Sequence, residues 1–155
     1  MKKIIFPILI FLLITTGCGF KVFNQADLIN FSIEEIRITG DNRINYNLKN
    51  KINSSLNSDY TKKIILIIKT KKNKTIKEKN IKNEITKYQV SINANIRIKS
   101  ADFIMKQFTI SENGDYNVST QHSQSINSEK KLIRQLSNSL GDKIVEELLF
   151  RLNDI

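Results

Sequence analysis

An alternation of apolar and polar residues from Lys87 to Lys99, KYQVSINANIRIK, is the clearest pattern in the chain. Its apolar positions all fall on one side: Tyr88, Val90, Ile92, Ala94, Ile96 and Ile98. A period of two predicts a long strand with one face in the core and one face in water. After a turn at Lys99 to Asp102, a partner strand is predicted from Phe103 to Ile110, and it can continue past the turn signal Asn113-Gly114 to Val118.

Two shorter segments complete the predicted sheet. Ile36 and Ile38 alternate with Arg37, as expected for a short strand. The β-branched run IILII, from Ile64 to Ile68, is typical of a strand buried on both faces or central in a sheet. The basic stretch KTKKNKTIKEKNIKN that follows predicts an exposed continuation of this strand and then a turn.

Two further segments have helical periodicity. Asp41 or Asn42 can cap a helix that ends near residues 57–59, and its apolar residues recur every four positions: Ile44, Leu48, Ile52 and Leu56. Ser128 to Leu152 predicts a second helix, whose apolar stripe includes Leu132, Leu136, Leu140, Ile144 and Leu148. Glu129 would then suit the positive end of the helix dipole, and Gly141 costs about 1 kcal/mol relative to alanine without cancelling the pattern.

The order β-α-β-β-β-α predicts an α+β fold: a two-layer sandwich in which two helices cover one face of a mixed, mostly antiparallel β-sheet. The first strand-helix-strand unit predicts a right-handed crossover between parallel strands, and the later strands predict antiparallel hairpins. Residues 18–155 are enough for one domain with a real core.

The amino terminus has the features of an export signal. Met1 to Lys3 is positively charged, and Ile4 to Ile14 is an apolar run that is shorter than the roughly 20 residues of a membrane-spanning helix. The small residues Thr15, Thr16 and Gly17 follow, as expected before a cleavage site. Residues 1–17 are therefore predicted to be a signal peptide.

Cys18, the single cysteine, comes directly after these small residues and has no second thiol to pair with. This arrangement resembles the bacterial lipoprotein signal, although Thr15 stands where that signal usually has leucine. The resemblance implies cleavage between Gly17 and Cys18, acylation of Cys18 with chains such as palmitate, a tether over residues 18–30, and a membrane attachment by lipid. Gly19, in place of aspartate, favours the outer membrane, with the domain facing the periplasm. The alternative is a secreted protein without acylation.

Positive charge is concentrated in one zone. The chain has a net charge of +10, and nine lysines with one acidic residue lie between Lys62 and Lys82. Such a zone attracts polyanions. The hypothesis is that an anionic ligand binds a surface made of Lys71, Lys72, Lys74, Lys77, Lys79 and Lys82. The alternative is that the lysines protect a strand edge from aggregation.

Several segments together resemble the lipopolysaccharide-assembly lipoproteins of the LptE family, in the form found in alphaproteobacteria. These segments are GCGF, TKYQVSINANIRIK and DYNVSTQHSQSINSEKKLIRQLSNSLGDKIVEELLFRL. The resemblance implies a heterodimer with the LptD β-barrel, whose lumen holds these lipoproteins, and a part in lipopolysaccharide transport and assembly at the cell surface. The polar side of the long strand is then a candidate contact with the barrel wall: Gln89, Ser91, Asn93 and Asn95.

The residues give no sign of an enzyme, and no catalytic residues, metal ligands or cofactor are predicted. His122, the single histidine, falls in a predicted Ser/Thr/Gln-rich loop, and the sequence has no glycine-rich phosphate loop. Nucleic acid is not expected as a partner, because the export signal removes the chain from it and Tyr88 is the one aromatic residue of the alternating strand. A pilot or scaffold lipoprotein for a different outer-membrane complex is the alternative function.

Overall fold

A computed structural model describes residues 31–56, 62–100 and 103–153. The elements follow the predicted order: β1 (Ser32–Thr39), α2 (Asn42–Ser55), β2 (Lys63–Lys79), β3 (Ile85–Ser100), β4 (Phe103–Asn117) and α3 (His122–Asn153). The predictions for the signal peptide, for the Gly17-Cys18 cleavage and acylation site and for the tether at 18–30 lie outside the described residues.

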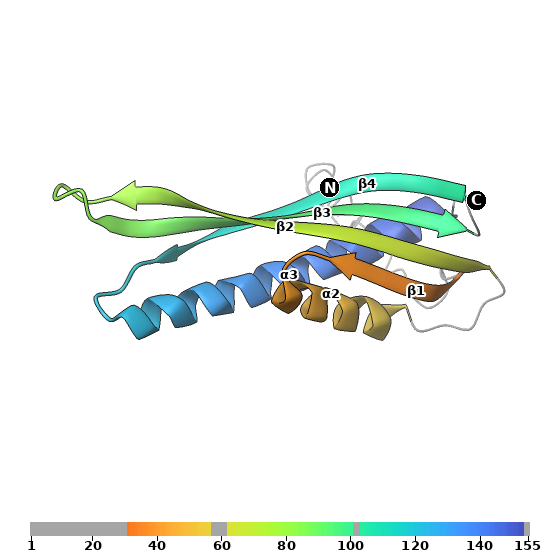
Figure 1. Cartoon of the computed structure of the whole chain (residues 1–155), viewed down its shortest axis with the longest axis horizontal. Helices are drawn as coiled ribbons and strands as arrows, with labels where there is room; N and C mark the ends of the chain where they lie inside the picture. The colour runs from red at the N-terminus through yellow and green to blue at the C-terminus, as the bar shows by residue number, and fades with distance from the viewer. Residues whose placement is uncertain (1–30, 57–61, 101–102, 154–155) are drawn as a thin grey trace, which may run out of the picture.

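The four strands form one mixed sheet in the order β1-β2-β3-β4 (Figure 1). β1 is parallel to β2, while β2, β3 and β4 are antiparallel neighbours, as the sequence predicted. β1 pairs with β2 only as far as Thr39 opposite Lys69. Beyond that point the sheet has three strands, and the remaining half of β2, from Thr70 to Lys79, becomes an edge.

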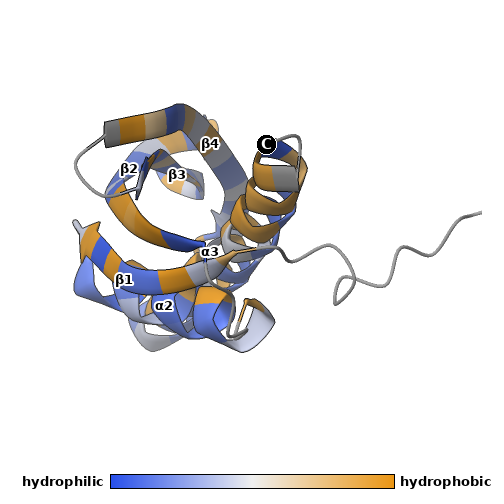
Figure 2. Ribbon diagram, turned by 90° about the vertical axis from the view of Figure 1, so that its right-hand side faces the viewer, coloured by the Kyte–Doolittle hydropathy of each residue, from blue (hydrophilic) through white to orange (hydrophobic). Residues whose placement is uncertain are grey.

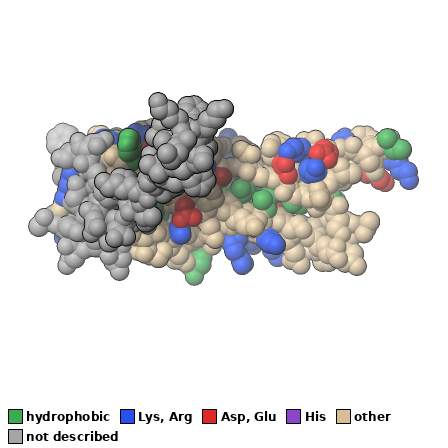
Figure 3. All heavy atoms as spheres, turned by 180° about the vertical axis from the view of Figure 1, so that it is seen from behind, with side chains coloured by type: hydrophobic (Ala, Val, Ile, Leu, Met, Phe, Trp, Pro, Cys, Tyr) green, Lys and Arg blue, Asp and Glu red, His purple; other side chains and the backbone are tan. Residues whose placement is uncertain are grey.

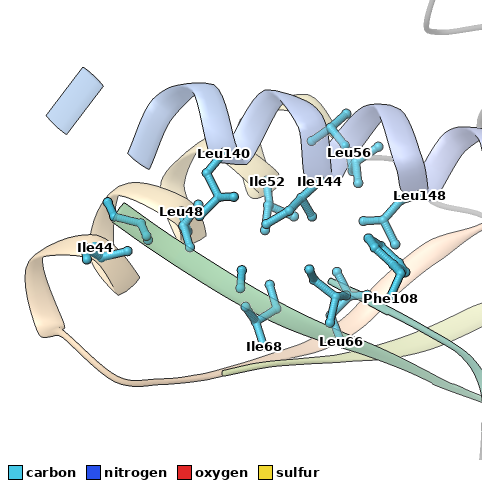
Figure 4. Packing of buried hydrophobic residues seen from close by; sticks show 14 of the residues in the cluster. Ile44, Leu48, Ile52, Leu56, Leu66, Ile68, Phe108, Leu140, Ile144 and Leu148 are labelled. Carbon is cyan, nitrogen blue, oxygen red and sulfur yellow. The ribbon is translucent and has the colours of Figure 1, made fainter. Parts of the chain in front are cut away.

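Both helices cover the same face of the sheet, so the predicted α+β two-layer arrangement is confirmed. Figure 2 shows hydrophobic segments on the strands and along α3, the elements that share the buried core. Leu140, Ile144 and Leu148 of α3 point toward the sheet and toward α2 (Figure 4). The alternating residues of the central strands are fully buried opposite them: Ile64, Leu66, Ile68, Val90, Ile92, Ala94, Ile96 and Ile98.

The start of α2 follows from one side chain. Asp41 is the N-cap, and its Oδ1 accepts hydrogen bonds from the backbone N–H groups of Arg43 at 3.0 Å and Ile44 at 3.3 Å. These bonds satisfy donors that have no partner within the helix. The four-residue spacing then buries Ile44, Leu48 and Ile52 completely between the sheet and α3.

The second helix starts earlier than predicted, at His122 instead of Ser128. His122 is therefore the first residue of α3, and the prediction that it lies in a loop is wrong. The carbonyl of Gln121 accepts the N–H groups of Gln124 and Ser125, and Ser125 Oγ accepts the N–H of Ser119 at 2.8 Å. These early turns are mostly exposed and have no apolar stripe, so periodicity alone cannot detect them. The dipole role expected for Glu129 is also wrong, because Glu129 lies two turns inside the helix.

β4 continues through Asn113-Gly114 without a turn. Gly114 lies opposite Val90 in the sheet, and a Cβ at this position would come within 2.8 Å of Leu132 Cδ1. The glycine thus allows α3 to approach the strand closely, which is a common reason for a glycine inside a strand.

Candidate functional site

The six candidate lysines do not lie on one surface. Lys72 and Lys74 pair in register with Ile92 and Val90, whose side chains are buried, so both lysines are on the helix-covered side of the sheet. Lys71 pairs with Asn93 and lies on the opposite, open side. Lys79 is the last residue of β2, and Lys82 lies in the loop between β2 and β3. The alternation of a strand divides a basic zone that is continuous in the sequence.

Lys72 joins β2 to the beginning of α2. Its Nζ lies 2.8 Å from Asp41 Oδ2, while the other carboxylate oxygen of Asp41 caps the helix. The hydrogen bond from Lys72 is the main reason that the pKa of Asp41 is lowered, and the backbone N–H groups of the helix act in the same direction. Lys72 thus has a structural partner.

Lys74 lies in a small polar and aromatic cluster with Glu129, Tyr88 and Tyr116. Its Nζ is 2.6 Å from Glu129 Oε2, 4.3 Å from the centre of the Tyr88 ring and 5.2 Å from that of Tyr116. The two rings stack with their centres 5.7 Å apart, and the Tyr116 hydroxyl donates to Glu129 at 2.8 Å. Burial is the largest single effect and alone would lower the pKa of Lys74, but the hydrogen bonds and charge interactions with Glu129 and Tyr116 together outweigh it, and the pKa is raised.

Lys77 is also paired, with Asp115 on β4. Glu78, the one acidic residue within the basic zone, is bound instead by Lys87 of β3 at 2.7 Å. Among the described residues, Lys71, Lys79 and Lys82 have no carboxylate partner. Lys79 donates to the neutral amide oxygen of Asn83 at 2.9 Å. No carboxylate of the described residues therefore offsets the positive charge of these three lysines.

The hairpin loop between β2 and β3 is closed by hydrogen bonds and carries one exposed apolar side chain. Asn80 Oδ1 accepts the backbone N–H groups of Lys82 at 2.9 Å and Glu84 at 3.0 Å, and Asn83 adopts a left-handed φ of 63°. Ile81 is fully exposed between Lys79 and Lys82. In the space-filling view, basic and hydrophobic side chains meet at the far end of the hairpin (Figure 3). This combination fits a ligand with both anionic and apolar parts.

The open side of the sheet carries an uncharged polar strip. Gln89, Ser91, Asn93 and Asn95 of β3 all lie on it and are partly exposed. Their hydroxyl and amide groups interlock with β4, since Asn95 Nδ2 donates to Thr109 at 3.1 Å and Ser111 donates to Asn93 at 2.6 Å. The structure thus brings the four candidate barrel-contact residues together on one surface.

Four cations gather at one end of this strip: Lys69, Lys71, Arg97 and Lys99. Lys69 and Lys71 lie opposite Asn95 and Asn93, and Arg97 and Lys99 follow on β3. Within the described residues none of the four has a carboxylate partner. Only Lys71 was a sequence candidate. The shared parity of the four positions along two paired strands is the signal that could have identified the other three.

Within residues 31–56, 62–100 and 103–153, no three His, Cys, Asp or Glu side chains are placed to hold a metal ion. In the same part of the chain, neither α2 nor α3 is long and apolar enough to cross a membrane.

Comparison with known proteins identifies the fold but not a close relative. No protein-family model matches the sequence, and no curated protein does either. Solved structures do match. Rare lipoprotein B from Shewanella oneidensis superimposes with a TM-score of 0.61 at 8% identity, over 77% of this chain and 97% of that one. The chain has the fold of this lipoprotein.

Two further bacterial lipoproteins share the fold. A minor lipoprotein from Acinetobacter baumannii matches with a TM-score of 0.60 at 9% identity, over 79% of this chain and 92% of the other. Lipoprotein B from Nitrosomonas europaea matches with a TM-score of 0.58 at 14% identity, over 82% and 88%. At these identities the match concerns architecture, and no residue role is transferred.

Proposed function

We propose that this chain is a lipoprotein of the outer membrane, anchored through acylated Cys18 and facing the periplasm, that binds the LptD β-barrel and takes part in lipopolysaccharide transport. The observation that carries the proposal is the shared architecture with rare lipoprotein B, which is itself a lipoprotein. The single cysteine directly after an export signal supports the same conclusion from an independent part of the chain.

The barrel would meet the open face of the sheet. Its uncharged strip of Gln89, Ser91, Asn93 and Asn95 offers hydrogen-bonding groups without an apolar patch, and a large barrel has a polar lumen wall. The apolar face of the sheet is covered by α2 and α3 and is therefore not free for such a contact.

The anchor can be tested by labelling cells with a fatty acid. The wild-type chain should incorporate label and fractionate with the outer membrane, and Cys18→Ser should do neither. An unlabelled wild-type chain would contradict the lipid attachment.

The partner can be tested with a photo-crosslinking residue at Asn93, on the open face, and at Asn50, on the exposed side of α2. Purification in mild detergent should recover the LptD barrel crosslinked through position 93 and much less through position 50. Recovery of a different outer-membrane complex through position 93 would instead support the pilot or scaffold function.

A further inference from the structure

Within the described residues, the outer edge of β4 has no strand paired with it. β4 is the last strand of the sheet, and no described segment forms a ladder with its outer side. Exposed edges tend to pair with another strand unless charges or irregularities prevent it. The free half of β2 is rich in lysine, but the β4 segment KQFTISE, Lys106 to Glu112, has one charged residue at each end and none between them.

A groove runs beside this edge. It has a volume of about 640 Å³ and is lined by Thr109, Ile110 and Ser111 of β4 and by residues of α3 that include Phe150. Phe150 is 70% exposed although it is large and apolar. Apolar side chains beside an open strand edge are typical of a surface that accepts another strand.

The chemistry of KQFTISE is self-complementary in the antiparallel sense. A two-fold axis at Thr109 places Lys106 opposite Glu112 of a second copy, and Gln107 opposite its Ser111. The same axis places Phe108 opposite Ile110 of the second copy, so charge meets opposite charge and apolar meets apolar. Moving the axis to Phe108 sets Lys106 against Ile110, and moving it to Ile110 sets Phe108 against Glu112. Only the axis at Thr109 satisfies all three pairs.

The existing contacts of the two charged residues leave room for these pairs. Glu112 Oε1 accepts from Lys143 at 2.6 Å and from Ser139 at 3.1 Å, and its second oxygen has no partner among the described residues. Lys106 donates one proton to the Arg151 carbonyl and has two others. Each charged group can therefore also bind across the edge.

α3 is arranged consistently with the same axis. Lys143 contacts Glu112, and the Arg151 guanidinium lies 4.7 Å from the centre of the Phe108 ring, so α3 runs antiparallel to β4. Phe150 is therefore close to the level of Thr109. A two-fold axis there brings the two exposed Phe150 side chains to the same side of the joined sheet.

We propose that two copies of this chain associate through β4, in antiparallel register about Thr109, to form a continuous sheet with the helices of both copies on one face. Such an interface is isologous, so each contact is made twice. The inference concerns self-association and does not depend on the proposed function.

The first test is sedimentation of the full chain carrying Cys18→Ser, which removes acylation, over a range of concentrations. Two double variants are compared: Q107E/S111K, which places opposite charges across the proposed edge, and Q107E/S111E, which places like charges there. Both put glutamate at position 107 beside Arg97, so they differ only at position 111. The dissociation constant of the dimer should be about tenfold lower with Q107E/S111K than with Q107E/S111E, because two cross-strand pairs change from repulsive to attractive. A chain that stays monomeric, or two variants of equal affinity, would overturn the proposal.

The second test reports the register. With Cys18→Ser as background, Thr109→Cys should crosslink two copies through a short bismaleimide, because position 109 lies on the axis. Asn95→Cys is the control, since it pairs with Thr109 one strand further in on the same face. Absence of the crosslink at 109, or equal crosslinking at 95, would contradict the β4 edge. Far-UV circular dichroism of each variant verifies that it is folded.

Discussion

Lys74 of β2 and Glu129 of α3 form an ion pair of 2.6 Å across 55 positions of the sequence. The pair lies on the helix-covered side of the sheet, in the part of β2 that no longer pairs with β1. Stacked Tyr88 and Tyr116 flank it, and Tyr116 donates to the same carboxylate oxygen. This contact therefore ties the three-stranded half of the sheet to the amino-terminal half of α3.

The ion pair predicts an acid-sensitive contribution to stability. Burial alone would raise the pKa of Glu129, but the hydrogen bonds from Lys74 and Tyr116 lower it below its ordinary 4.5. A lowered folded-state pKa means that the contribution is complete above the unfolded value and is lost as pH falls through the folded value. Glu129→Gln should reduce the free energy of unfolding by about 1 to 2 kcal/mol at pH 7, and by much less at pH 3, in urea denaturation.

Glu34→Gln is the matched control, because it removes one exposed carboxylate for which no pairing is described. It should leave the free energy of unfolding at pH 7 nearly unchanged. An equal loss in both variants, or a loss with Glu129→Gln that is the same at both pH values, would contradict a specific ion pair.

Tyr116 should ionise later than an ordinary tyrosine. Burial raises its pKa above the usual 10.0; nearby Glu129 acts in the same direction, and Lys74 partly opposes the shift. We expect a spectrophotometric titration of the phenolate absorbance to contain a component that appears at higher pH than that of an ordinary tyrosine and that Tyr116→Phe removes. Tyr46→Phe, which removes a tyrosine exposed at 68%, is the control and should leave the Tyr116 component in place.

Gly40 is required by the turn between β1 and α2. Its φ is +130°, and a Cβ there would lie 2.2 Å from Thr70 Oγ1 and 2.5 Å from the Thr70 carbonyl oxygen. Gly40→Ala should therefore lower the free energy of unfolding by about 2 to 5 kcal/mol, from backbone strain and overpacking together. Gly114→Ala should cost about 1 kcal/mol or less, because its close neighbour is the movable end of Leu132. Similar losses in thermal or urea unfolding would contradict this difference.

The fold could be predicted from the sequence because the spacing of apolar residues differs between its strands and its helices. Ile92, Ala94 and Ile96 alternate with polar residues, and Ile44, Leu48 and Ile52 recur every four positions; all six side chains are completely buried. The start of α3 could not be predicted in this way. His122 and the turns after it are exposed, and their helix is fixed by hydrogen bonds around Ser119 and Ser125 that have no hydrophobic signature.

The candidate site was predicted only in part. The uncharged strip of β3 follows directly from alternation, so Asn93 and Asn95 lie together as expected. The basic zone did not remain one surface, because Lys72, Lys74 and Lys77 find acidic partners that are 31, 55 and 38 positions away in the sequence. Such partners depend on the tertiary structure, and a local count of charges does not contain them.

The division of the lysines predicts two different consequences of removing them. Lys71, Lys79 and Lys82 have no carboxylate partner in the described part of the chain, so replacing all three with glutamine should hardly change the melting temperature. If they bind lipopolysaccharide, the same triple variant should weaken binding of the purified lipid about tenfold, at up to about 1 kcal/mol for each exposed pair, and flatten its dependence on salt.

The matched control is K49Q/K130Q/K131Q, which removes three exposed lysines from α2 and α3 and the same net charge. Equal loss of binding in both triple variants would show that total charge alone attracts the lipid. Unchanged binding with increased aggregation of the first variant would instead support protection of the free β2 edge, because that edge has no β1 partner beyond Lys69.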